Sequence, residues 1–325
     1  MKIFDWVQWT SDCRLAVDTE DDAAAAAARR AVSYELESVE RVMNRWVKHS
    51  EISLINDSVR ARGSVSCKVS DTLAFLIMQA LYSYDFTDGA FDPRVEDSLQ
   101  ALGYGAGLES LDLQVTSGGR LVCQQTGSLN LHDQVQLNYE NQGWLLTTSA
   151  TLDLTAIGKA CAADFAAEAA AEAAQAPVLL SLGGDISTAG AYYSREKNPG
   201  WAVVVEDLLG DPQAVVELIN NGAIATSSSQ KRTWGEASWH HIIDPRTGLS
   251  AEPDLKTASV IAETAAVANV LATAAIVWGR QAKEELAQRN CAARLVTAQN
   301  LLIHHNWPEN TEQGSDPELA GASRD

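Results

Sequence analysis

The clearest pattern in the chain is a set of hydrophobic residues at helical spacing. Six consecutive alanines lie near the start of the segment from Asp21 to Trp46, and alanine favours helix. Val42 and Met43 lie three and four positions after Val39, and the same face reaches Trp46. We therefore expect this face, with Met43 and Trp46, in the core. Similar spacing or an alanine-rich composition predicts helices over residues 70–84, 157–176 and 263–278.

Short hydrophobic runs bounded by Gly, Asn, Ser or Pro predict strands. These runs cover residues 12–18, 120–123, 143–146, 178–182, 201–205, 257–262 and 294–297. Because strands and helices do not alternate regularly, we predict an α+β fold over residues 1–306, a single large domain of mixed sheets flanked by helices. Residues 307–325 are polar and acidic, which predicts a disordered tail.

Composition narrows the class of protein. The chain has 325 residues, a formal net charge of −19 and 46% hydrophobic residues, typical of a folded globular protein. The negative charge repels phosphate backbones and anionic membranes, which argues against nucleic acid as a partner. Five cysteines without a close pair are expected to be reduced. The sequence shows no signal-peptide pattern and no apolar run of ~20 residues, so we expect a cytoplasmic protein without membrane insertion.

Two loops of small residues could bring a ligand close to the backbone. Gly183, Gly184 and Asp185 follow the strand predicted over 178–182; the glycines would admit a ligand, and the carboxylate could accept its hydrogen bond. An ordinary turn is the alternative. Residues 221–229 pass through a turn and a small-residue strand into four hydroxyl residues, and the Lys-Arg pair at 231–232 adds charge that suits phosphate. Here the alternative is a solvated polar loop.

Two further segments suit acid–base chemistry and metal binding. His240 and His241 precede an Asp-Pro turn; a histidine can act as general base, and on a strand only one of two adjacent rings faces a site. A purely structural role is the alternative. Asn269 and Thr273 lie four residues apart on the last predicted helix and project from one face, where oxygen ligands suit Mg²⁺. The alternative is a plain pair of polar helix residues.

Several short segments follow one another in an order that resembles a known family. They are Met43 to Trp46 with Ser50 to Asn56, Gly89 to Pro93 with Ala101 to Tyr104, Leu152 to Leu154 with Gly158-Lys159 and Ala163-Asp164, Leu182 to Ile186, Ala225 to Ser227, His241 to Gly248, and Ala268 to Thr273. In this order they resemble the ApbE family of flavin transferases, whose members move FMN from FAD onto a Thr or Ser of a target protein. The resemblance covers most of residues 10–280 and implies an ApbE-like fold related to the T-fold.

The resemblance also implies a site. Residues implied to contact FAD are Met43, Ala90, Phe91, Asp92, Asp153, Lys159, Gly183, Gly184, Asp185, Thr226 and Ile243. His241 takes the position of the histidine that activates the acceptor hydroxyl. Mg²⁺ would be held by the backbone carbonyl of Ala156 and by Asn269 and Thr273. Because Asn269 stands where the family usually has Asp, one anionic ligand is missing and we expect weaker metal binding.

The activity implied is that of an FAD:protein FMN transferase. An acceptor hydroxyl would attack the FMN-side phosphorus of FAD, and AMP would leave. The partner would be a flavoprotein with a Thr or Ser in its FMN-attachment motif. Two alternatives stay open: an FAD pyrophosphatase, in which water replaces the hydroxyl, and a non-catalytic FAD-binding protein.

Overall fold

An eight-stranded sheet forms the centre of the molecule. The computed structural model describes residues 1–104, 129–190, 200–206, 212–219, 221–235, 239–252, 254–289 and 291–308. In spatial order the strands are β1 (Lys2–Gln8), β2 (Ser11–Val17), β6 (Val178–Leu182), β7 (Asp185–Ala189), β10 (Ala223–Ser228), β15 (Leu255–Ala262), β16 (Ala292–Thr297) and β17 (Leu302–His305). Each neighbouring pair in this sheet is antiparallel. The predicted α+β class is confirmed.

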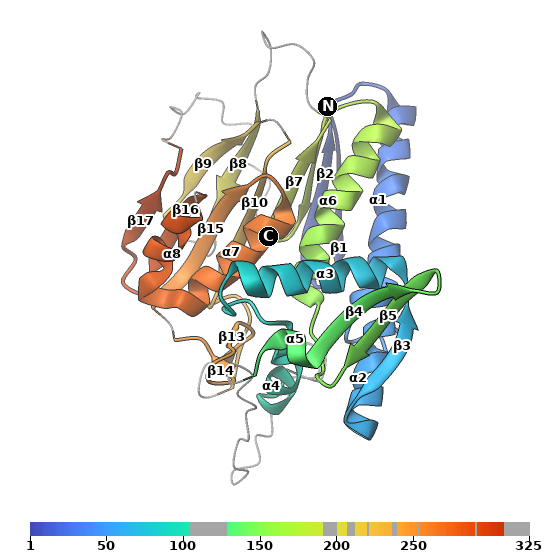
Figure 1. The fold of residues 1–325 in the computed structure, drawn as a ribbon. Coiled ribbons are helices and arrows are strands. Elements are labelled where there is room, and N and C mark those ends of the chain that lie inside the picture. The colour runs from blue at the N-terminus through green and yellow to red at the C-terminus, as the bar shows by residue number, and fades with distance from the viewer. Residues whose placement is uncertain are drawn as a thin grey trace.

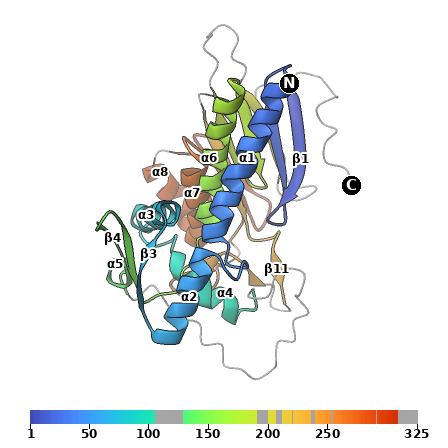
Figure 2. The same cartoon turned by 90° about the vertical axis from the view of Figure 1, so that its right-hand side faces the viewer.

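Helices cover one face of this sheet and a hairpin covers the other. α1 (Asp22–Met43), α6 (Thr155–Ala174) and α7 (Ala265–Trp278) lie side by side, with α8 (Ala282–Gln288) after α7 (Figures 1 and 2). β8 (Trp201–Val205) and β9 (Ala214–Leu218) pair with each other and pack on the opposite face. Successive strand residues therefore enter different cores: Leu180 packs with the helices and Leu179 with the hairpin.

A smaller layer lies across one end of the long helices (Figure 1). It contains α2 (Glu51–Arg62), β3 (Val65–Val69), α3 (Asp71–Phe86), the 3-10 helix η1 (Pro93–Val95), α4 (Glu96–Ala101), α5 (Leu131–Gln134), β4 (Val135–Glu140) and β5 (Gly143–Thr148). Its three strands pair in the order β3-β5-β4. The N–H of Asp153 donates to the carbonyl of Pro93 over 2.7 Å, which fastens this layer to the start of α6.

Two short hairpins complete the described fold. They are β11 (Thr233–Trp234) with β12 (Trp239–His240), and β13 (Ile243–Asp244) with β14 (Leu249–Ser250). Trp234 and Ile243 share a small core with Leu99, Leu102 and Tyr104 from the smaller layer. The segment that contains the two adjacent histidines is thus held against the smaller layer.

Small residues let α1 and α6 approach closely. Ala160, Ala163 and Ala167 on α6 are 0% exposed. A Cβ on Gly158 would lie 2.7 Å from the Sδ atom of Met43, so glycine at this position makes room for that side chain. Met43, the last residue of α1, is thereby packed on the first turns of α6.

Most predicted elements are confirmed, with ends that differ by a few residues. The four predicted helices correspond to α1, α3, α6 and α7, and six predicted strands correspond to β2, β5, β6, β8, β15 and β16. The strand predicted over 120–123 lies outside the described residues, as do residues 309–325 of the predicted tail. Trp307, also assigned to that tail, is only 9% exposed and packs on the hairpin side of the sheet.

The expectation that Trp46 is a core residue is wrong. α1 ends at Met43, and the side chain of Asn44 accepts a hydrogen bond from the N–H of Trp46 over 3.0 Å, which turns the chain out of the helix. Trp46 is 38% exposed, and its ring lies 5.2 Å from the guanidinium of Arg45 and 5.9 Å from the ring of Tyr104. The helical spacing continues in the sequence beyond the point where this local bond ends the helix.

The cysteines and the helices bear on two further expectations from the sequence. Cys13, Cys67, Cys161 and Cys291 are free thiols, as expected. In the part of the chain that the structure describes, no helix combines the length and apolar character that crossing a membrane requires.

Candidate functional site

The turn between β6 and β7 is held very close to its neighbours. Gly183 has a φ of +68°, and its N–H donates to the carbonyl of Asp12 over 2.9 Å. A Cβ on Gly184 would lie 2.7 Å from the carbonyl oxygen of Thr226. Gly183 adopts a positive φ that other residues rarely adopt, and Gly184 leaves no room for a side chain. The fold therefore requires glycine at both positions. The turn also places Asp185 at the start of β7 with its side chain toward the helices.

Asp185 joins residues from two helices in a buried polar cluster. It is 2% exposed, and its Oδ1 atom accepts a 2.7 Å hydrogen bond from Nδ2 of Asn269 on α7. Its Oδ2 atom lies 3.3 Å from Nζ of Lys159 on α6. Asp185, Asn269 and Lys159, which are far apart in the sequence, thus meet at the start of β7, on the face of the sheet that the helices cover.

The predicted metal residues of α7 lie in this same cluster. Oγ1 of Thr273 is 3.1 Å from Oγ of Ser227, and the Oδ1 atom of Asn269 is buried without a hydrogen-bond partner within the described residues. Ala156 lies in the first turn of α6, one turn before Lys159. The described residues contain no group of three or more His, Cys, Asp and Glu side chains that could hold a metal. The amide, hydroxyl and carbonyl oxygens nevertheless fit a hard cation such as Mg²⁺, which a ligand's phosphates would also bind.

The ring of His241 is uncharged at neutral pH. Burial, and next the positive charges of Arg232, the adjacent histidine and Lys159, lower its pKa to about 3. Its Nδ1 atom is buried and accepts no hydrogen bond in the part of the chain that the structure describes. The ring lies 6.3 Å from that of Tyr104, which stacks on Trp234 at 4.8 Å. A positioned, uncharged imidazole with a vacant nitrogen can accept a proton.

The neighbouring histidine has a different role. Nε2 of His240 bonds the carbonyl of Ala251 over 3.0 Å, and the N–H of Ile242 donates to its Nδ1 over 3.3 Å. Both ring nitrogens of His240 are therefore occupied by backbone. The ring of His240 therefore has no free nitrogen, and the availability of the His241 ring to a site stays a prediction.

Positive charge gathers between His241 and the Gly-Gly turn. Nη2 of Arg232 lies 3.4 Å from Oγ of Ser11, and a Cβ on Gly183 would lie 3.1 Å from that same oxygen and 3.4 Å from Nζ of Lys159. Arg232 forms no ion pair within the described residues, so its charge is available to a ligand. In a chain with a net charge of −19, this corner suits an anionic group such as a diphosphate.

The residues around Asp92 form a second buried group. Both oxygens of Asp92 accept hydrogen bonds from the guanidinium of Arg94, the shortest of 2.6 Å, and Oδ1 also accepts from the N–H of Arg94. Arg94 donates further to the carbonyl of Leu129 and to Oε1 of Gln134. Phe91 is 6% exposed within the main core. Asp92 is thus fully engaged inside the protein, and its contact with flavin stays a prediction.

The sequence model of the ApbE family matches residues 9–295. The chain belongs to the ApbE family. Curated relatives carry the name FAD:protein FMN transferase. One from Escherichia coli strain K12 is 27% identical over 292 residues, or 87% of this chain and 80% of the relative. Another from Treponema pallidum is 27% identical over 277 residues, or 82% of this chain and 76% of the relative.

Solved structures of the ApbE family share the fold. The ApbE protein of Thermotoga maritima superposes with a TM-score of 0.80 at 22% identity and covers 94% of this chain and 97% of its own. The flavinyl transferase ApbE of Pseudomonas stutzeri reaches 0.76 at 18% identity and covers 94% of each chain. The predicted ApbE-like architecture is therefore confirmed.

Within this ApbE fold, the remaining predicted residues fall into different places. The hydroxyl of Thr226 bonds that of Ser259 over 2.8 Å, on the hairpin face of the sheet, whereas Ser227 faces the helices. Asp153 accepts from the N–H of Thr155 over 2.7 Å at the start of α6. Ile243 is 4% exposed in the small core that includes Tyr104, and Ala90 is partly buried beside α7. The side chain of Thr226 thus lies on the face of the sheet opposite to the Asp185 cluster.

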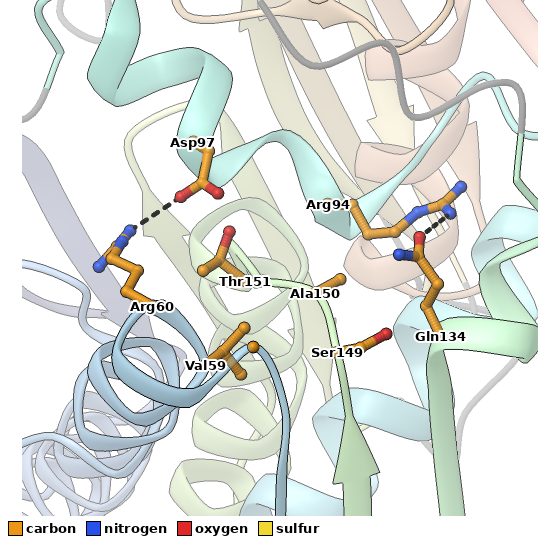
Figure 3. Close-up of a pocket in the computed structure, with 9 residues that line it drawn as sticks. Val59, Arg60, Arg94, Asp97, Gln134, Ser149, Ala150 and Thr151 are labelled. Atoms are coloured by element: carbon orange, nitrogen blue, oxygen red, sulfur yellow. Dashed lines mark hydrogen bonds and ion pairs between the residues drawn. The ribbon is translucent and has the colours of Figure 1, made fainter.

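A cavity of 270 Å³ lies outside this set of residues (Figure 3). It is lined by Val59, Arg60, Gly63, Arg94, Asp97, Gln134, Ser149, Ala150 and Thr151. Figure 3 shows Arg60 directed toward Asp97 and Arg94 toward Gln134. Since Arg60 also pairs with Glu96, and Arg94 with Asp92, both guanidinium groups already have carboxylate partners. The cavity therefore lacks the available positive charge found near His241.

Three residues at the site carry weak signals in the sequence. Tyr104 belongs to one of the ApbE-like segments, but its packing against His241 follows from a stack with Trp234 across more than a hundred residues. Nε1 of Trp234 donates to the carbonyl of Leu102 over 2.6 Å, which holds that stack. Arg232 is visible in the sequence only as part of a basic pair, and its neighbour Ser11 lies at the other end of the chain.

Proposed function

We propose that this protein is an FAD:protein FMN transferase, which moves FMN from FAD to a Thr or Ser hydroxyl of an acceptor flavoprotein and releases AMP. The observation that carries the proposal is the neutral His241 beside the positive charges of Arg232 and Lys159. Relatives with this name over most of the chain support the same assignment.

The transfer needs a base, positive charge and alignment. The acceptor oxygen forms a bond to the FMN-side phosphorus, the bond from that phosphorus to the bridging oxygen breaks, and AMP leaves with the electron pair. Nδ1 of His241 takes the hydroxyl proton, because this nitrogen is vacant and its pKa keeps it unprotonated at neutral pH. Arg232 and Lys159 attract the diphosphate and reduce its charge repulsion toward the incoming oxygen.

Mg²⁺ belongs to the proposal. The carbonyl of Ala156, Oδ1 of Asn269 and Oγ1 of Thr273 would hold it, and when bound it would neutralise charge on the diphosphate. The support in this chain is the buried Oδ1 atom of Asn269, which has no hydrogen-bond partner among the described residues.

Incubation of the purified protein with FAD and Mg²⁺ tests the proposal. The reaction is run with and without an acceptor peptide that carries a Thr, and the peptide is analysed by mass spectrometry while AMP is measured by chromatography. We expect a mass gain equal to one FMN residue and an equal amount of AMP. Release of free FMN and AMP without a peptide would instead identify an FAD pyrophosphatase. Intact bound FAD would identify a non-catalytic flavin-binding protein.

A further inference from the structure

Two buried carboxylates face the helices at the centre of the sheet, and their hydrogen-bond partners differ. Asp164 accepts from the N–H groups of Ala265 and Ala266 and from the hydroxyl of Ser187, at 2.8 to 3.0 Å. Both of its oxygens therefore hold the start of α7. The side chain of Asp185 accepts one hydrogen bond, from Asn269; its Oδ2 atom accepts none within the described residues and lies 3.3 Å from Nζ of Lys159.

The bond to Asp185 decides how the amide of Asn269 is oriented. A carboxylate accepts but does not donate, so the amide must turn its Nδ2 atom toward Asp185. Its Oδ1 atom then points away from Asp185, which agrees with its lack of a hydrogen-bond partner in the described part of the chain. A buried amide oxygen held in this way is a preformed ligand for a cation, and a missing ligand leaves it unsatisfied.

We propose that Asp185 supplies the negative charge of the cation site that residue 269 does not, by holding Oδ1 of Asn269 toward the cation and placing a carboxylate directly behind it. The inference rests on the proposed function, because that function calls for a divalent cation. A carboxylate behind a neutral ligand strengthens binding, as the outer partners of metal ligands commonly do.

The same geometry explains why an asparagine is suited to position 269. An aspartate there would replace the amide that now donates to Asp185 over 2.7 Å, and two carboxylates have no donor for that hydrogen bond. One amide and one carboxylate form the bond, so an exchange of the two side chains keeps it.

The test uses the full chain and measures metal binding rather than turnover. Binding of Mn²⁺ alone, and of Mn²⁺ with FAD, is followed by electron paramagnetic resonance for the parent, Asp185→Asn, Asn269→Asp and the exchanged double variant. We expect Asp185→Asn to weaken Mn²⁺ binding by about tenfold or more. The exchanged variant should return to within about threefold of the parent, since it restores one carboxylate and one amide.

Controls separate this effect from loss of folding. Asp254→Asn removes a carboxylate from an exposed pair with Arg280 and should leave Mn²⁺ binding unchanged. Circular dichroism of each variant monitors the fold. Unchanged Mn²⁺ binding in Asp185→Asn, absence of Mn²⁺ binding in the folded parent, or a folded exchanged variant that binds no better than Asp185→Asn would each overturn the inference.

Failure of this inference is distinguishable from failure of the proposed function. Mn²⁺ binding that depends on Asp185, together with absence of FMN transfer, would keep the inference and overturn the transferase. FMN transfer together with Mn²⁺ binding that does not depend on Asp185 would keep the transferase and overturn the inference.

Discussion

Asp92 and Asp185 are both buried carboxylates, yet their surroundings differ. Asp92 is held on both oxygens by Arg94, whose other donors are also used. Asp185 accepts one hydrogen bond from the amide of Asn269, and its other oxygen lies 3.3 Å from Nζ of Lys159, while Oδ1 of Asn269 and Nδ1 of His241 have no hydrogen-bond partner within the described residues. A satisfied network stabilises the fold, whereas clustered vacant polar atoms indicate where a ligand binds. The comparison therefore assigns Asp92 to the scaffold and Asp185 to the candidate site.

The largest effect should follow from His241→Ala. If this corner is the site, loss of the base should lower FMN transfer by about 100- to 10,000-fold, while FAD affinity changes little. Transfer is measured by mass spectrometry of the acceptor peptide, and FAD binding by flavin fluorescence. His240→Ala is the matched control. Both ring nitrogens of His240 bond to the backbone, so this variant should mainly lower the stability of the protein. Equal loss of FAD binding and transfer in His241→Ala would reduce His241 to a structural role.

A large change in stability is expected on the scaffold side. Arg94→Ala leaves the buried carboxylate of Asp92 without its cation, which should lower the free energy of unfolding by about 3–5 kcal/mol. Urea unfolding followed by circular dichroism measures it. Arg280→Ala removes a cation from an exposed pair and should cost no more than about 1 kcal/mol. Similar losses in the two variants would contradict the description of Asp92 as a scaffold residue.

An intermediate effect is expected at the turn that positions Asp185. Gly184→Ala adds a Cβ 2.7 Å from the backbone oxygen of Thr226, and strands must shift to admit it, at a cost of about 1–3 kcal/mol. Gly143→Ala is the control, because a Cβ there meets nothing within 4 Å. Thermal unfolding compares the two. A Gly184→Ala protein as stable as Gly143→Ala would show that the turn can relax.

The smallest effect concerns pH. The pKa of His241 is about 3 in the folded chain, below the ordinary 6.5, so the unfolded chain binds the additional proton. The stability from the neutral ring is present above pH 6.5 and is lost as the pH falls toward 3, by at most about 1.4 kcal/mol per pH unit. Urea unfolding from pH 7 to about 5 should show a shallower decline in His241→Gln than in the parent. Parallel declines would mean that the ring is not held neutral.

Local patterns carry much of the fold. The alanine-rich helices α1, α6 and α7 and the hydrophobic strand β6 are found where periodicity and composition predict them. Periodicity and composition do not predict β1 and α2, because β1 is a half-exposed edge strand and α2 carries many polar residues. The signals of α2 are local instead: Ser50 accepts from the N–H of Ser53, and Gly63 follows at a φ of +81°.

The sequence by itself determined the helices and strands with strong patterns, and its ordered segments indicated the ApbE family. Only the tertiary structure decided which polar groups meet. Thr226 and Ser227 are neighbours in the sequence, yet the alternation of a strand places their hydroxyls on opposite faces of the sheet. Asp185 and Asn269 stand 84 residues apart and share a hydrogen bond because β7 and α7 pack together. Which strand lies beside which helix depends on contacts between residues far apart in the sequence, so no local pattern encodes it.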